Sequence, residues 1–137
     1  MIDKTNPLSY MSKEEVLYEL LKKEYGYYSS IREITKQENE KLARHDPLSE
    51  INPLLKQKKI LLSCITEIES SMQPLKKYWR EKQERNDPVS LKIKKQLAEM
   101  DHLLKDILQL DLISQKSLEE HLLYLQNQNQ PSDKKAK

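Results

Sequence analysis

Glycine occurs once in this chain of 137 residues, at Gly26, and that scarcity limits the folds open to the sequence. Tight β-hairpin turns depend on glycine because it adopts positive φ angles without steric penalty. The chain can therefore form few such turns, which argues against sheets joined by hairpins and favours long helices with few connections. Charged residues make up 34% of the chain and hydrophobic residues 36%. These proportions suit narrow apolar seams of the coiled-coil type better than a thick globular core.

Proline-containing junctions divide the chain into helical segments. Asp46, Asn52 and Asp87 each stand directly before a proline, which is the arrangement of a helix N-cap followed by proline at the first helical position. Near the start of the chain, Ser12 and Glu15 have the three-residue spacing of a capping box. Each of these signals predicts the start of a helix.

These starts predict three helices, over about 12–45, about 53–85 and about 88–127, with a single helical turn near 47–51. Similar lengths and short connections favour antiparallel neighbours. The expected fold is therefore all-α: an elongated antiparallel bundle of three long, coiled-coil-like helices in one domain, residues 1–127. Residues 128–137 are almost entirely polar, and this tail is expected to be disordered.

Each predicted helix carries apolar residues at coiled-coil spacing. The expected seam residues are Leu17, Leu20, Tyr27, Ile31 and Ile34, with Glu24 and Glu38 between them, in the first helix; Leu54, Lys58, Leu61, Ile65, Ile68, Met72, Leu75 and Trp79 in the second; and Ile93, Leu97, Met100, Leu104 and Ile107 in the third. Pro74 predicts a kink near residues 70–74. In the third helix Asp111 and Ser114 interrupt the stripe before Leu118, so its second half is expected to bury less apolar area than its first.

Gly26 lies inside the first predicted helix, in the stretch EYGYYSS, among Tyr25, Tyr27 and Tyr28. Glycine costs roughly 1 kcal/mol relative to alanine inside a helix, so its position needs a reason. One interpretation is that the first helix passes close to another helix here, with Tyr27 on the seam. The other is an exposed aromatic patch in which Tyr25 and Tyr28 form a secondary docking site for a partner.

The sequence offers little catalytic chemistry. His45, His102 and His121 fall on different segments without the spacing of metal ligands, so each is expected at a surface or boundary and no metal site is predicted. One glycine cannot build a phosphate-binding loop, and no catalytic triad is suggested. We therefore expect a protein that is not an enzyme and needs no cofactor.

Cysteine content, hydropathy and charge set expectations for location and partners. Cys64 is the single cysteine, expected as a small buried hydrophobe, so a disulfide framework is impossible and a reducing compartment is favoured. No apolar run approaches the roughly 18 residues of a membrane span, and no signal sequence precedes the first helix, so a cytoplasmic location is expected. The net charge of +2 is spread with mixed signs. The basic stretch over 76–85 is better explained as a solvated helix face than as a nucleic-acid site.

A family resemblance follows from the order of features over about residues 15–70. They are Leu20 and Leu21, Glu24, Tyr27 or Tyr28, Ile31, Ile34, Glu38, Leu42, the break at Asp46, Ile51, Leu54 and Leu55, Lys58, Leu61 and Leu62, Ile65, and the pair Ile68 and Glu69. This pattern resembles the FlgN family of flagellar type III export chaperones, with a looser likeness through residues 97–125. The chain departs from the family at Ser70, Ser71 and Met72, where an arginine is common, which bears on the client more than on the fold.

The resemblance implies a cytoplasmic helical chaperone. It would keep secreted hook-filament junction proteins (hook-associated proteins) unassembled and deliver them to the export apparatus. The family engages an amphipathic helix of its client mainly through its C-terminal region. Carried over to this chain, the partner-binding residues are Leu108, Leu112, Ile113, Leu118, Leu122 and Leu125.

Two other interpretations remain open from the sequence. The leucines of the third helix can pack within the bundle instead of binding a client. The whole chain can also be a generic coiled-coil adaptor or assembly subunit that forms a homo-oligomer through its seams and has no secreted client.

Overall fold

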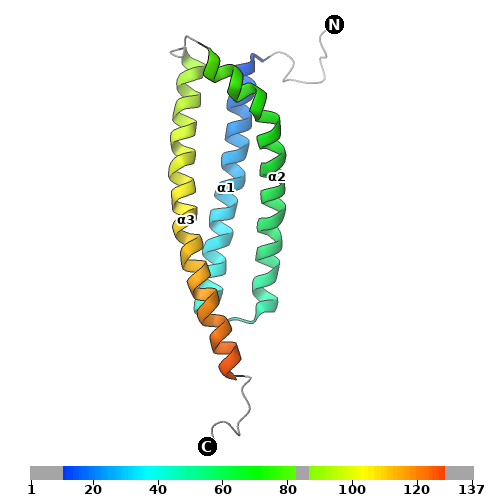
Figure 1. Ribbon diagram of the computed structural model, residues 1–137, viewed down its shortest axis with the longest axis vertical. Coiled ribbons are helices and arrows are strands. Elements are labelled where there is room, and N and C mark those ends of the chain that lie inside the picture. Colours follow the sequence, from blue (N-terminus) through cyan, green and yellow to red (C-terminus); the bar gives the residue numbers. More distant parts are fainter. Residues whose placement is uncertain (1–10, 83–86, 129–137) are drawn as a thin grey trace, which may run out of the picture.

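The computed structural model describes residues 11–82 and 87–128, which form three long helices in up-down-up order (Figure 1). α1 spans Lys13–Ala43, α2 spans Leu48–Glu81 and α3 spans Pro88–Gln128. The prediction of an all-α, elongated bundle of three long helices is confirmed. Beyond Gln128, the predicted disordered tail lies outside the described residues.

The two outer helices pack on α1 and hardly contact each other (Figure 1). α1 runs antiparallel to α2 and parallel to α3, as the up-down-up order requires. In a four-helix bundle each helix packs against two neighbours and faces the third helix across the core. The three helices therefore occupy the places of a four-helix bundle that lacks the member diagonal to α1.

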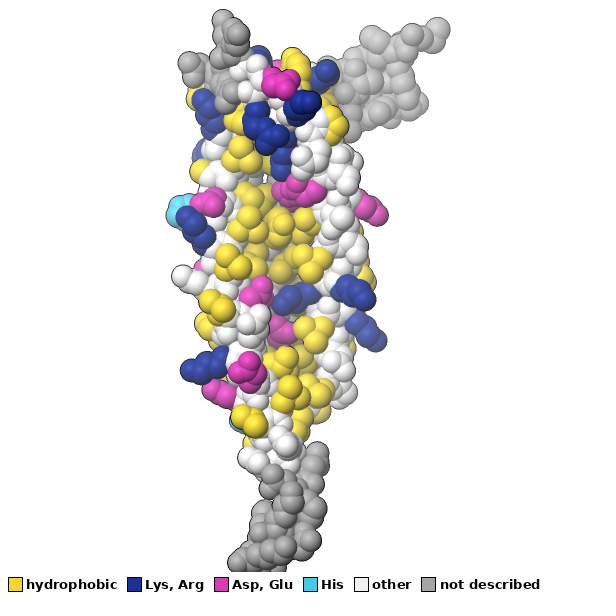
Figure 2. All heavy atoms as spheres, in the orientation of Figure 1, with side chains coloured by type: hydrophobic (Ala, Val, Ile, Leu, Met, Phe, Trp, Pro, Cys, Tyr) yellow, Lys and Arg dark blue, Asp and Glu magenta, His cyan; other side chains and the backbone are white. Residues whose placement is uncertain are grey.

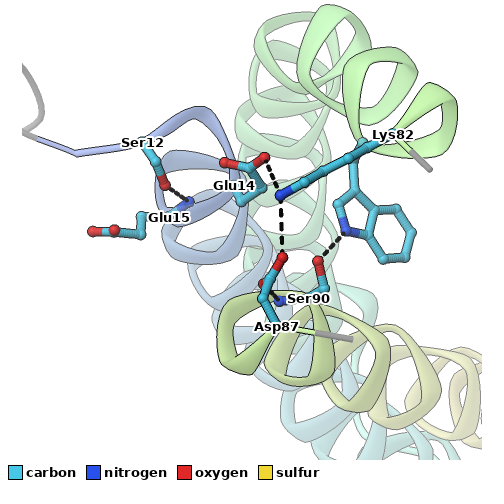
Figure 3. Close-up of polar contacts among 7 residues, drawn as sticks. Ser12, Glu14, Glu15, Lys82, Asp87 and Ser90 are labelled. Atoms are coloured by element: carbon cyan, nitrogen blue, oxygen red, sulfur yellow. Dashed lines mark hydrogen bonds and ion pairs between the residues drawn. The ribbon is translucent and has the colours of Figure 1, made fainter. Parts of the chain in front are cut away.

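The starts of α1 and α3 confirm two of the predicted caps. The Glu15 backbone N–H donates to Ser12 Oγ at 3.1 Å, and the Ser90 backbone N–H donates to Asp87 Oδ1 at 2.8 Å. The reciprocal half of the predicted capping box is missing, because the Glu15 carboxylate points away from Ser12 (Figure 3).

The start of α2 was predicted wrongly. α2 begins at Leu48, with Pro47 at the N-cap position, and the turn expected near 47–51 is its first turn. Pro53 therefore lies inside the helix, and neither Asp46 nor Asn52 caps it. The turn is held by tertiary packing, since Ile51 is buried in the core. A proline this close to the N-terminus removes only one intrahelical hydrogen bond.

α1 ends in a Schellman motif at His45. The Asp46 N–H donates to Lys41 O at 2.9 Å and the His45 N–H donates to Leu42 O at 3.1 Å, the two bonds of that motif. His45 has a φ of 57°, a left-handed conformation that usually selects glycine or asparagine. The cap turns the chain from α1 into α2.

Lys82 ties the opposite end of the bundle together (Figure 3). Its Nζ donates to Glu14 Oε1 at 2.9 Å and to Asp87 Oδ2 at 3.1 Å. These contacts, with Glu14 and then with Asp87, raise the pKa of Lys82 to about 12. The last part of α2, beyond Pro74, bends toward α3 as predicted (Figure 1), and Trp79 Nε1 donates to Ser90 Oγ at 3.2 Å.

Two clusters of buried apolar side chains form the core, and each draws on all three helices. The first contains Leu17, Leu21, Ile68, Met72, Trp79 and Ile93, and the second contains Ile31, Ile65, Leu103 and Ile107. Most of the predicted seam is buried. The exceptions on α3 are Leu97 and Leu104, which lie beside the seam, while Gln96 and Leu103 take the buried positions.

The structure overturns the interpretation of Gly26 as a site of close helix approach. A Cβ atom built on Gly26 meets nothing within 4 Å, and the residue is exposed. The three neighbouring tyrosines pack against the second core cluster without needing a small residue between them. Cys64, expected to be buried, is half-buried.

Gly26→Ala should raise the free energy of unfolding by about 1 kcal/mol, because alanine loses less backbone entropy in a helix and finds open space here. Urea denaturation followed by circular dichroism measures the change. The reverse substitution at an exposed site of α3, Ala98→Gly, should lower the free energy of unfolding by a similar amount. A loss of stability in Gly26→Ala would show that a neighbour does occupy this side of α1.

Candidate helix-binding groove

A groove runs along the bundle between α2 and α3, with α1 as its floor; we call it the α2–α3 groove. Its floor consists of the buried or half-buried face of α1: Leu17, Leu21, Glu24, Tyr28, Ile31, Thr35, Glu38 and Leu42. Its rims follow seven-residue spacing, with Leu55, Leu62, Glu69 and Lys76 on α2, and Leu97, Leu104, Asp111, Leu118 and Leu125 on α3. Figure 2 shows this face, where hydrophobic side chains gather between the two outer helices.

Contacts across the groove fix the orientation of both rims. Lys76 and Leu97 line the same pocket, and Lys58 of α2 reaches Asp111 of α3. Residues seven apart share a face of a coiled-coil helix, so the remaining rim residues point to the same side. Each rim thus carries leucines that face the opening.

The pocket lies at the end of the groove near Lys82 and has a volume of about 200 Å³. Its lining comes from all three helices: Leu17, Leu21, Lys76, Trp79, Arg80, Ile93 and Leu97. The aromatic ring of Trp79 is buried among aliphatic side chains there. A pocket of this composition suits one large apolar side chain of a partner.

Two carboxyl groups and a lysine cross the groove beyond this pocket. Glu24, which is 3% exposed, shares a hydrogen bond with Glu69, and Glu69 accepts hydrogen bonds from Lys76 Nζ at 3.1 and 3.2 Å. Burial, and then the contact with Glu69, raises the pKa of Glu24 to about 8. The hydrogen bond from Glu24, together with Lys76, lowers the pKa of Glu69. One carboxyl group is therefore neutral and its partner is ionised at pH 7.

A second charged crossing lies farther along the groove. Lys58 Nζ contacts Glu38 Oε1 at 3.3 Å and Asp111 Oδ1 at 3.5 Å. This lysine links all three helices where α2 and α3 would otherwise have no contact. Glu24 and Glu38 were both expected on the seam of α1, but their partners on α2 were not predicted.

The buried stripe of α3 changes from apolar to polar along its length. Every seventh residue from Ile93 is buried, and the series reads Ile93, Met100, Ile107, Ser114 and His121. The Ser114 hydroxyl hydrogen-bonds Asn39 Oδ1, and Asn39 Nδ2 donates to Leu110 O at 3.3 Å. No hydrophobic residue between 108 and 128 is buried, in agreement with the expected difference between the two halves of this helix.

His45 and His121 meet at the end of the groove, contrary to the prediction that the histidines lie apart on the surface. Their Nδ1 atoms are 3.4 Å apart, and the His45 ring stacks on Tyr124 with centroids 4.3 Å apart. His121 is fully buried because it continues the seven-residue stripe of α3. Within residues 11–82 and 87–128, no group of three or more possible ligands is placed to hold a metal ion.

The six predicted partner-binding residues separate into two groups. Leu118 and Leu125 lie half-buried on the α3 rim, and Leu108 and Leu122 flank this rim with exposures of 62% and 48%. Leu112 and Ile113, exposed by 66% and 52%, point away from the groove. The structure thus brings four of the predicted residues to one surface, and the sequence analysis missed the α2 rim that faces them.

The predicted secondary docking residues, Tyr25 and Tyr28, are half-buried. Both pack against the second core cluster. Tyr28 lies on the floor of the α2–α3 groove near Glu24, where burial raises the pKa of its hydroxyl.

Comparisons of the chain with protein-family models, with curated proteins and with solved structures found no match. Among the described residues, none of the helices is both long enough and apolar enough to cross a membrane.

The stability of the protein should fall as the pH rises from about 5 to about 8. The ordinary pKa of glutamate is 4.5 and that of folded Glu24 is about 8, so the folded state holds a proton in this window that the unfolded state has released. Stability then decreases with pH, by on the order of 2 kcal/mol in total. Glu69, whose pKa is lowered, acts in the opposite direction only below this window.

Urea denaturation at several pH values measures the effect. Glu24→Gln keeps a neutral side chain of the same shape and should remove most of the decrease above pH 5. Glu67→Gln, at an exposed site of α2, is the matched control and should retain it. An unchanged pH profile in Glu24→Gln would show that Glu24 is ionised in the folded protein at pH 7.

Proposed function

We propose that this protein binds an amphipathic helix of a partner protein in the α2–α3 groove, as an export chaperone of the FlgN type. In this role it holds secreted hook-filament junction proteins unassembled in the cytoplasm and delivers them to the export apparatus. The observation that carries the helix-binding part is that α2 and α3 both pack on α1 and leave the diagonal fourth place of the bundle open. The secretion part rests on the sequence resemblance over about residues 15–70.

The dimensions of the groove fit a helix. α1 has 31 residues, so the floor is about 45 Å long at 1.5 Å per residue. The leucines on both rims repeat at seven-residue spacing, which matches the apolar stripe of an amphipathic helix. A partner helix of about 25 residues can therefore cover both core clusters and most of the second half of α3.

Exposed apolar surface supplies the driving force for binding. Burying such surface contributes roughly 25 cal/mol per Å², of which part offsets the cost of ordering the complex. Leu62, Leu108 and Leu122 are each about half exposed or more. Covering them and the pocket beside Trp79 would make binding favourable without any change in the core.

The polar seam of the second half of α3 suits exchange of contacts. Ser114 and His121 replace the apolar residues that hold the first half to α1. Elements with few buried apolar contacts open at lower free energy than the rest of a fold. A chaperone must release its client, and a groove with one weakly anchored wall supports reversible binding.

The outward-facing apolar residues of α3 also favour the second candidate function, a coiled-coil adaptor that self-associates. Leu112, Ile113 and Leu123 are each more than half exposed and lie away from the groove rim. A second copy of the chain could cover them. Sedimentation equilibrium separates the functions, because a tight oligomer that leaves no rim leucine accessible to a partner contradicts the chaperone proposal.

Leu118→Asp should abolish binding of a client, because it places a charge on the α3 rim between the second charged crossing and the end of the groove. The measurement is co-expression with a secreted hook-filament junction protein, followed by purification of the complex and determination of its Kd. At least a hundredfold weaker binding is expected, with helicity by circular dichroism largely retained. Leu122→Asp should act in the same direction.

Ile60→Asp is the matched control. Ile60 is 64% exposed on α2 but faces away from the groove, so its substitution should leave client binding unchanged. Normal binding by Leu118→Asp, or equal loss in Ile60→Asp, would contradict the assignment of the site.

A further inference from the structure

The Glu24, Glu69 and Lys76 cluster contains two carboxyl groups but one lysine that contacts them. The cluster would carry a net negative charge if both carboxyl groups were ionised. The charge is balanced instead by a proton held on Glu24, since its carboxyl group is neutral at pH 7. The cluster is thus one cation short of a fully ionised arrangement.

The hydrogen bonding of Glu24 is also incomplete. Its Oε2 atom is buried and has no hydrogen-bond partner among the described residues. Leaving a buried polar atom without a partner costs roughly 1–3 kcal/mol. Such an atom next to an open apolar groove indicates a place where a partner completes the interaction.

The other groups around Glu24 leave this need unmet. On α1, Tyr28 lies beside both carboxyl groups, and on α2 the Gln73 amide donates to Glu69 at 3.4 Å. On α3, the buried residues nearest Ile93 of the adjoining pocket are Gln96 and Met100, both uncharged. The cation that would balance the cluster must therefore approach along the groove.

Glu69 offers the point of approach. Its side chain is 35% exposed and lies on the α2 rim, where the long side chain of Lys76 can move toward Glu24. The second crossing differs, because both Glu38 and Asp111 already contact Lys58. The two charged crossings are thus unequal, and only the one at Glu24 calls for a cation from outside.

We propose that the occupant of the α2–α3 groove is an amphipathic helix of a partner protein that carries a lysine or arginine within its apolar stripe, placed to pair with Glu69 and Glu24. This proposal rests on the proposed function and adds the chemical class of the helix that is selected. When the cation binds, Glu24 releases its proton to solvent and Lys76 is shared between two carboxylates. The cation also fixes the register of the bound helix, because it matches only one of the two crossings.

The test uses two synthetic helical peptides of about 25 residues, which span the groove. Both carry leucines at the core positions and differ only at one central core position, which is lysine in one and methionine in the other. Trp79 is the single tryptophan of the chain and lines the pocket, so its fluorescence reports binding to the full-length protein. The lysine peptide should bind about tenfold more tightly than the methionine peptide.

Two further measurements assign the difference to the carboxyl pair. The advantage of lysine should disappear in Glu24→Gln and in Glu69→Gln, and remain in the control Glu67→Gln. Calorimetry at pH 7 in two buffers of different ionisation enthalpy should show proton release with the lysine peptide and little with the methionine peptide. Folding of each variant is checked by circular dichroism, and the comparison of the two peptides on the unmodified protein needs no variant.

Failure of this proposal is distinct from failure of the proposed function. Equal binding of the two peptides, or tighter binding of the methionine peptide, overturns the role of the cation and leaves the groove as a helix-binding site. If neither peptide binds at concentrations up to about 1 mM, where a docked helix contributes roughly 4 kcal/mol or less, the groove does not accept a helix and both proposals are overturned.

Discussion

The packing of both outer helices on one face of α1 determines the form of the whole structure. α1 presents a broad buried face in which Leu17, Leu21 and Ile31 reach residues of α2 and α3 together. Because α2 and α3 each satisfy their apolar stripe on α1, they gain little from approaching each other and hardly do so. Salt bridges through Lys58 and Lys82 link the helices at two levels, and the surface between them stays open as the α2–α3 groove.

Polar residues on the buried faces give the groove its chemical character. An apolar seam throughout would make a stiffer bundle, but Glu24 and Glu38 on α1 and Ser114 and His121 on α3 interrupt it. Buried polar groups of this kind lower stability and specify register. Glu24 differs from the others because its charge is balanced by a proton and because one of its oxygen atoms lacks a partner. These features locate the place where a bound helix would change the protonation of the protein.

Much of the fold could be predicted from local signals, whereas the site depends on contacts between helices. The single glycine, the seven-residue stripes and the caps at Ser12 and Asp87 were sufficient to predict three long helices. The start of α2 failed because buried Ile51 outweighs the proline signal at Pro53. The partners Glu69 of Glu24 and His45 of His121 are 45 and 76 positions distant in the sequence, and periodicity alone does not pair residues across helices. The leucines of α3 were recognised, but their division between the groove rim and the outer face required the register of α3 on α1.

The central claim is that a fourth helix fits between α2 and α3, and leucine methyl NMR tests it most directly. A spectrum of the full-length protein with assigned leucine methyl groups is recorded as the lysine-bearing peptide is added. The account predicts that the shifts concentrate on the two rims, at Leu55 and Leu62 of α2 and at Leu97, Leu104 and Leu118 of α3, while the outward Leu91 and Leu112 change little. Shifts confined to Leu91, Leu112 and Leu123, with both rims unchanged, would contradict it.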